Sequence, residues 1–210
     1  KMTIPLLAKN KIVGVLCCQI ETGYQLNEQQ RELLSSLGRQ LGMALENIRL
    51  YEEARALSLH DPLTGLANRR YLDISYANQV ARSKRHTQPF SLMLLDIDHF
   101  KLYNDNHGHG QGDRILIQVA DILRDSIRST DLAVRYGGEE FLLLISDSKA
   151  DAAFELAERI RLQIAGEIGV TISIGIADYR VNDILDTQIL RADMALYKAK
   201  HAGRNRVEVE

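Results

Sequence analysis

The stretch Ser91-Leu92-Met93-Leu94-Leu95-Asp96-Ile97-Asp98 decides the fold. Its Leu92–Leu95 run is continuous in apolar residues, which is typical of a strand that is buried on both faces. Strand alternation places Asp96 and Asp98 on one face and Ile97 on the other. Because an unpaired buried charge is strongly unfavourable, both carboxylates must cap backbone groups, pair with a cationic side chain or hold a cation.

Helical and strand patterns alternate on both sides of this stretch. We expect helices at 69–85, 111–128, 150–165 and 186–201, and strands at 91–98, 132–136, 141–145, 170–177 and 206–210. We expect residues 99–110 to form a loop, and Gly137-Gly138 to turn a hairpin. Strands interleaved with helices predict an α/β (α+β) sandwich with a mixed central sheet that is flanked by helices.

A second pair of acidic residues, Glu139 and Glu140, follows the Gly137-Gly138 turn. If this hairpin pairs beside the Asp96 strand, carboxylates from both meet at one end of the sheet. Carboxylates without thiols or clustered imidazoles favour Mg²⁺ over Zn²⁺, and such Mg²⁺ keeps positions open for phosphate oxygens. The two glycines allow positive φ and close approach of a ligand. The alternative is an ordinary tight turn with solvated acidic residues.

Polar residues that suit a nucleotide follow in two places. Asn104, His109 and Asp113 come after the acidic strand, and a carboxylate such as Asp113 can accept the two donors of a guanine edge. The alternative is a turn Asn and a favourable first-turn acid. Lys200 and Arg204 share a face if their helix continues, and they can contact phosphate. Cations also stabilise a helix C-terminus without any ligand.

The N-terminal quarter has a different pattern. Strands at 3–8 and 12–20, joined by a turn at 9–11, precede a long helix with Asn27 and Gln30 in capping-box positions. Apolar residues at alternating spacings of 3 and 4 form a heptad seam from Leu34 to Tyr51, at Leu34, Leu37, Leu41, Ala44, Ile48 and Tyr51. The seam predicts a parallel two-helix contact in a homodimer. The alternative is an amphipathic helix packed on its own domain.

Composition excludes several classes of protein. The 210 residues carry 26 Lys+Arg and 28 Asp+Glu, a net charge of -2, which argues against nucleic acid as a partner and against a polybasic membrane anchor. Two adjacent cysteines, Cys17 and Cys18, cannot form a disulfide framework, so we expect a cytoplasmic location. No apolar run approaches the ~18 residues of a membrane segment. The chain begins mid-pattern at Lys1, and we expect a fragment of a longer protein whose other parts could attach to a membrane.

Four ordered motifs resemble the GGDEF diguanylate cyclases. They are DPLTGLANRR at 61–70, LDIDHFK at 95–101, RYGGEEF at 135–141 and AK followed by GRN at 199–205. This chain carries GGEEF, an active variant of the signature, and the resemblance covers about residues 58–210. Residues 1–26 resemble the last strands of a GAF sensor domain, and residues 27–57 a signalling and dimerisation helix. The resemblance implies a fold like that of nucleotidyl cyclases and polymerase palms.

The resemblance also implies chemistry. Members of the family condense two GTP into cyclic di-GMP and release pyrophosphate, across two half-sites that face each other in a dimer. Two Mg²⁺ ions per half-site, or Mn²⁺, would be held by Asp96, Glu139 and the Ile97 carbonyl. Glu139 would help to deprotonate the attacking 3′-hydroxyl, with Glu140 assisting. The residues implied in substrate binding are Asn104, His109 and Asp113 for guanine, and Phe100, Lys101, Gly137, Gly138, Lys200 and Arg204 around the phosphates.

An inhibitory site is implied as well. Arg128-Ser129-Thr130-Asp131 is an RxxD motif five residues ahead of GGEEF, where the family binds its product. Arg128 would pair with guanine and phosphate, Asp131 would accept from the guanine edge, and Arg159 is a further partner. The alternative is a surface salt bridge. For the whole domain, a non-catalytic nucleotide receptor and a dimerising scaffold are the alternative functions, and the intact acidic and polar residues speak against both.

Overall fold

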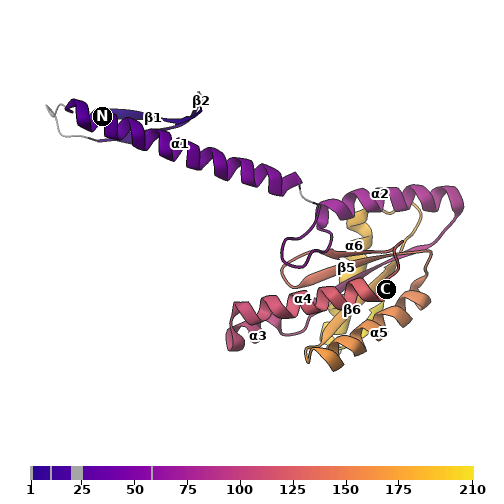
Figure 1. Ribbon diagram of the computed structural model, residues 1–210. Helices are drawn as coiled ribbons and strands as arrows, with labels where there is room; N and C mark the ends of the chain where they lie inside the picture. The colour runs from indigo at the N-terminus through magenta and orange to yellow at the C-terminus, as the bar shows by residue number, and fades with distance from the viewer. Residues whose placement is uncertain (1, 10, 20–25, 58) are drawn as a thin grey trace. The chain divides into compact units, whose positions relative to one another are not determined.

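The computed structural model describes residues 2–9, 11–19, 26–57 and 59–210 (Figure 1). The chain separates into two compact units, Lys1–Ser58 and Leu59–Glu210. Each unit has its own sheet, with two strands in the first and five in the second.

The first unit is a hairpin with a long helix. Strands β1 (Met2–Ala8) and β2 (Lys11–Cys18) pair antiparallel, and helix α1 runs over Glu28–Leu57. The expected capping box is present, because Gln30 N–H donates to Asn27 Oδ1 at 2.8 Å and Asn27 N–H donates to Gln30 Oε1 at 3.0 Å. The strand expected at 12–20 ends at Cys18, and Ile20 lies outside the described residues. No helix in the described ranges is long and apolar enough to cross a membrane.

Helix α1 packs on its own hairpin through two glycines. A Cβ on Gly38 would lie 2.6 Å from the Pro5 carbonyl oxygen, and one on Gly42 would lie 2.4 Å from the Leu7 backbone. Such close approach is possible only without side chains. The hairpin covers this side of α1 and leaves much of the heptad seam exposed, with exposed fractions of 43–69% at Leu37, Leu41, Ile48 and Tyr51.

The second unit is built around a mixed five-stranded sheet in the order β4-β5-β3-β6-β7, in which every neighbouring pair is antiparallel except β6-β7. Its strands are β3 (Phe90–Ile97), β4 (Leu132–Arg135), β5 (Glu140–Ser146), β6 (Ile172–Asp178) and β7 (Val207–Val209). Its helices are α2 (Arg69–His86), α3 (Phe100–His107), α4 (His109–Ser126), α5 (Ala150–Glu167) and α6 (Leu185–His201). This architecture confirms the expected mixed sheet flanked by helices.

Alternation along β3 divides the core between the two faces of the sheet. Met93, Leu95 and Ile97 pack into a cluster with α4 and α5. Leu92 and Leu94 pack into a second cluster with α2 and α6 on the opposite face. Figure 1 shows these helix pairs on either side of the sheet. The period of two therefore carries on to Asp96, which belongs to the face that α6 covers.

The loop expected after the acidic strand is wrong in part. Residues 100–107 form helix α3, which begins after His99 in the left-handed region at φ 57° and ends at Gly108 at φ 82°. Helix α4 then begins at His109, two residues earlier than expected. Asn104 therefore lies in α3, and His109 and Asp113 lie in the first turns of α4.

Gly175 of β6 sets the distance between α6 and the sheet. A Cβ there would lie 2.1 Å from the Ala192 carbonyl oxygen and 2.3 Å from Leu196 N. Because both atoms are helix backbone, Gly175→Ala must push α6 outward, and we expect a loss of roughly 1–3 kcal/mol in unfolding free energy. Urea unfolding of the variant and of the wild-type protein measures this loss in free energy.

Gly166 in α5 provides the matched control, because a Cβ there meets no atom within 4 Å. Gly166→Ala should be neutral or stabilising by up to about 1 kcal/mol. Equal unfolding midpoints for the two variants would show that Gly175 does not determine how closely α6 packs on the sheet.

Candidate functional site

Three carboxylates meet where β3 and β5 lie side by side. Asp96 pairs with Glu140 in the antiparallel register of these strands. Glu139 directly precedes β5, and its carbonyl accepts a hydrogen bond from Ile97 N–H at 3.4 Å. The hairpin therefore does pair beside the acidic strand, and its acids approach Asp96 as the sequence predicts.

Burial and mutual repulsion make these acids hard to ionise. Burial raises the pKa of Asp96, although the Lys200 ammonium opposes the shift. Burial, followed by the negative charge of Asp96, raises the pKa of both Glu139 and Glu140. A cluster of carboxylates whose pKa values are all raised favours any cation that enters it.

Lys200 supplies a cation to this cluster. Its Nζ lies 2.8 Å from Asp96 Oδ2. In the described ranges, no three His, Cys, Asp or Glu side chains are arranged to hold a metal by themselves. A metal bound here would therefore need a backbone carbonyl or ligand oxygens in addition to two carboxylates. The oxygen-only donors fit a hard cation such as Mg²⁺.

The Gly137-Gly138 turn joins β4 to β5 as expected, but neither glycine has positive φ, so this expected use of them is wrong. A Cβ on Gly137 would lie 2.5 Å from Glu140 Oε2, the end of a flexible side chain that can move aside. A Cβ on Gly138 would meet no atom within 4 Å. Gly138 therefore borders open space beside the acids, where a ligand can approach the backbone.

Arg135 and Asp61 fix this turn. Arg135 donates through Nη1 to both oxygens of Asp61, at 3.1 and 3.3 Å, and through Nη2 to the Gly138 carbonyl at 2.8 Å. Asp61 also accepts from the N–H and the hydroxyl of Thr64, at 2.9 and 2.7 Å. Both residues lie in motifs of the sequence, DPLTGLANRR and RYGGEEF, which by themselves assign no role to Asp61 or Arg135. The opposite charges of the two residues can be read from the sequence. Their contact cannot, because they lie 74 positions apart.

Asn104 and Asp113 lie on the neighbouring helices α3 and α4. Asn104 Oδ1 is buried and has no hydrogen-bond partner within the described structure. It occupies space next to Gly112, where a Cβ would lie 1.8 Å away. Asp113 directly follows Gly112 and is exposed. A buried acceptor without a partner beside an exposed carboxylate provides two acceptors for the donors of a ligand.

The other residues expected to bind substrate differ in burial and in their place in the fold. Phe100 is buried in the core, so only its backbone can face a ligand, while Lys101 and His109 are exposed. Lys200 and Arg204 would share one helix face only if their helix continued, but α6 ends at His201. Arg204 instead lies in a turn at φ 62°. It is nevertheless close enough to Asp96 to oppose the rise in the pKa of that carboxyl.

The three residues expected at an inhibitory site line one pocket of about 200 Å³. Asp131 accepts from Arg128 N–H at 3.1 Å and from Ser146 N–H at 3.0 Å. Arg159 donates through Nη2 to the Ser126 carbonyl at 3.1 Å. Asp131 therefore shapes the loop, whereas the Arg128 side chain is exposed to solvent.

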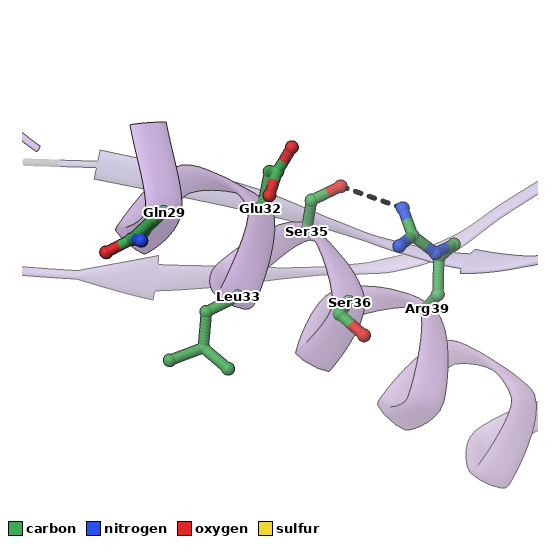
Figure 2. Close-up of a pocket in the computed structure, with 6 residues that line it drawn as sticks. All are labelled: Gln29, Glu32, Leu33, Ser35, Ser36 and Arg39. Atoms are coloured by element: carbon green, nitrogen blue, oxygen red, sulfur yellow. Dashed lines mark hydrogen bonds between the residues drawn. The ribbon is translucent and has the colours of Figure 1, made fainter. Parts of the chain in front are cut away.

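A larger hollow runs along α1 and is shown in Figure 2. Its lining residues all come from one helix, and Arg39 donates to Ser35 Oγ at 3.0 Å within it. A wide hollow on a single exposed helix gives a ligand little to contact. We therefore place the candidate site at the ends of β3 and β5.

Comparison with known proteins decides the family. The family described as "Diguanylate cyclase, GGDEF domain" matches residues 58–206. The chain belongs to the GGDEF family. The GAF domain family matches residues 1–45. Both family resemblances are confirmed, and the GAF match extends past residue 26 into helix α1.

Two curated relatives of this GGDEF protein match nearly the whole chain. Diguanylate cyclase A of Treponema denticola is 34% identical over 97% of the chain and 58% of its own length. Diguanylate cyclase DgcP of Pseudomonas aeruginosa is 36% identical over 99% of the chain and 33% of its own length. The chain thus spans about a third to three fifths of these relatives.

Solved structures agree with the fold. The GGDEF domain of DgcB from Caulobacter crescentus, in complex with c-di-GMP, has a TM-score of 0.69 at 33% identity and covers 72% of this chain and 92% of its own. The active GGEEF domain of a diguanylate cyclase from Vibrio cholerae has a TM-score of 0.65 at 37% identity, covering 69% of this chain and 97% of its own.

The Asp61–Arg135 pair predicts a pH-dependent stability. Burial raises the pKa of Asp61, but hydrogen bonds from Thr64 and Arg135 outweigh burial and hold it below the ordinary value of 3.8. A lowered folded pKa contributes stability that is present above the unfolded pKa and is lost as the pH falls through the folded pKa. Asp61→Asn should therefore cost roughly 1–3 kcal/mol at pH 7 and less in acid.

Urea unfolding at pH 7 and at about pH 3 measures this difference. Asp73→Asn, at an exposed position of α2, is the control and should change the unfolding free energy at pH 7 by no more than about 0.5 kcal/mol. If the loss in unfolding free energy caused by Asp61→Asn stays the same down to pH 3, the charge of Asp61 is not its cause.

Proposed function

We propose that the unit Leu59–Glu210 is a diguanylate cyclase that condenses two GTP into cyclic di-GMP and two pyrophosphates. The observation that carries the proposal is the gathering of Asp96, Glu139 and Glu140 beside Lys200 at the ends of β3 and β5. Support comes from relatives named as diguanylate cyclases and from the c-di-GMP bound to the DgcB domain.

The proposed cofactor is Mg²⁺, two ions per half-site, with Mn²⁺ as a substitute. Asp96, Glu139 and the Ile97 carbonyl would hold it. When bound, the metal neutralises phosphate charge and acidifies the attacking hydroxyl. The oxygen-only donor set and the raised pKa values of the carboxyls fit such a cation.

The protein residues bind and orient the nucleotide. Asn104 and Asp113 accept from the guanine edge, with His109 at the same pocket, and Asp113 favours guanine over adenine. Lys200 and Arg204 bind the terminal phosphates, and the backbone at 99–101 and 137–138 follows the phosphate chain. Lys200 donates to Asp96, and because an ammonium has three N–H donors it can bridge this carboxylate and a phosphate.

The bond change occurs between two such half-sites. The 3′-hydroxyl oxygen of one GTP attacks the α-phosphorus of the other, and the bond from this phosphorus to the pyrophosphate oxygen breaks. Glu139, with Glu140 beside it, takes up the hydroxyl proton as the attack proceeds. Repeating the step in the opposite direction closes the ring.

The half-sites would be brought together by a homodimer. We assign dimerisation and signalling to residues 27–57 and the remnant of a GAF-like sensor to residues 1–26, in a cytoplasmic protein. The exposed apolar residues Leu37, Leu41, Ile48 and Tyr51 support a helix pair. A linked pair would raise the effective concentration of one half-site near the other.

Incubation with GTP and Mg²⁺, followed by chromatography of the nucleotides, tests the activity. Wild-type protein should form cyclic di-GMP, with a specific activity that rises with protein concentration.

Glu139→Ala should lower the rate by at least about 10²-fold, because it removes both a proton acceptor and a metal ligand. Glu167→Ala, at the exposed end of α5, should keep the wild-type rate. Absence of product from a dimer shown by mass measurement would refute the cyclase in favour of a nucleotide receptor.

We also propose product inhibition at the pocket of Arg128, Asp131 and Arg159. Arg128 is the informative position, because Asp131 also holds two backbone N–H groups of the fold. Arg128→Ala should raise the cyclic di-GMP concentration for half-inhibition at least roughly tenfold while the initial rate is retained. Steady-state rates at increasing cyclic di-GMP concentration measure this half-inhibition concentration. Unchanged inhibition would place the product elsewhere.

A further inference from the structure

Asp98 is a buried carboxylate to which the proposed reaction assigns no task. It is only 7% exposed and accepts three hydrogen bonds. Ser173 Oγ donates to Oδ1 at 2.7 Å, while Thr171 Oγ1 and Asn205 N–H donate to Oδ2 at 2.7 and 3.0 Å. Thus Asp98 connects the acidic strand, the start of β6 and the turn that follows α6. It caps the backbone N–H of Asn205, which is one of the three outcomes left open by the sequence.

The turn held by Asp98 has an unusual backbone. Arg204 and Asn205 are consecutive non-glycine residues in the left-handed region, at φ 62° and 47°, after Gly203 at φ 115°. Such a conformation costs about 1–3 kcal/mol per residue and persists only where surrounding contacts impose it. Observed strain of this kind is a reason to look for a function in the turn.

Contacts from several elements impose this conformation. Arg204 N–H donates to the Ala199 carbonyl at 3.0 Å, which closes the end of α6. Arg161 of α5 donates to Asn205 Oδ1 at 2.8 Å. Among these contacts, Asp98 is the one that comes from the residue directly after β3, two residues after Asp96. It therefore links the position of Arg204 to the strand that carries the acid.

We propose that Asp98 is a positioning residue that fixes the Arg204 guanidinium for the terminal phosphates of the nucleotide. The inference rests on the proposed function, in which Arg204 binds those phosphates. The Asn205 N–H can only donate, so the turn needs an acceptor oxygen at this place, whereas the hydroxyls of Ser173 and Thr171 can also accept. Hydrogen bonds to a charged carboxylate are stronger than those to a neutral amide, so Asp98→Asn weakens the hold on the turn.

Isothermal titration with two nucleotides in the presence of Mg²⁺ tests this role. The α,β-methylene analogue of GTP has all three phosphates and cannot react, whereas GMP lacks the terminal phosphates. Asp98→Asn should weaken binding of the triphosphate analogue roughly tenfold and that of GMP less than about twofold. A merely structural loss would weaken both ligands alike.

The double variant shows whether Asp98 acts through Arg204. Arg204→Ala should weaken the triphosphate analogue selectively, and adding Asp98→Asn should have little further effect, because the energies of coupled residues are not additive. Additive losses, or equal losses for both nucleotides, would overturn the inference.

Two outcomes separate this inference from the proposed function. If wild-type protein binds neither nucleotide, the proposed function fails. If Arg204→Ala weakens the triphosphate analogue and Asp98→Asn does not, the positioning role alone fails. Should Asp98→Asn not fold, Thr171→Val removes one donor to the same carboxylate oxygen and is expected to show a smaller loss with the same preference for the triphosphate. An equal effect on GMP would overturn the role in that variant too.

Discussion

The antiparallel pairing of β3 with β5 decides where every acidic group of the site lies. Its register sets Asp96 opposite Glu140 and places Glu139 beside the last residue of β3. A slip of one residue would turn Asp96 into the apolar cluster beneath α4 and α5. The apolar side chains of β3, buried on both faces, exclude that slip, so the packing of the core also fixes the arrangement of charge.

The basic half of the site depends on a different contact. Helix α6 lies close to β6 because Gly175 has no side chain, and this brings Lys200 to Asp96. The turn after α6 then carries Arg204, and Asp98, directly after β3, holds this turn through the Asn205 N–H. Acidic and basic groups thus share β3 as a common support. The site is assembled from segments more than 100 positions apart by strand pairing and one helix–sheet contact.

Local periodicity explains what could be predicted from the sequence. The alternation of Asp96, Ile97 and Asp98 and the capping box at Asn27 depend on neighbours only, and the structure contains both. Helix α3 was missed because its eight residues are too short for a clear period and it lies between polar residues and glycines. The partners of Asp61 and Asp98 depend on tertiary contacts, so no local pattern could show them.

The edges of the five-stranded sheet limit how two copies of this unit can meet. The edge strands β4 and β7 have only four and three residues. Strands this short offer few free backbone groups to a neighbouring molecule, which disfavours growth of the sheet by strand addition. Contacts between copies would then be made by side chains. Such contacts can form and separate without breaking backbone hydrogen bonds.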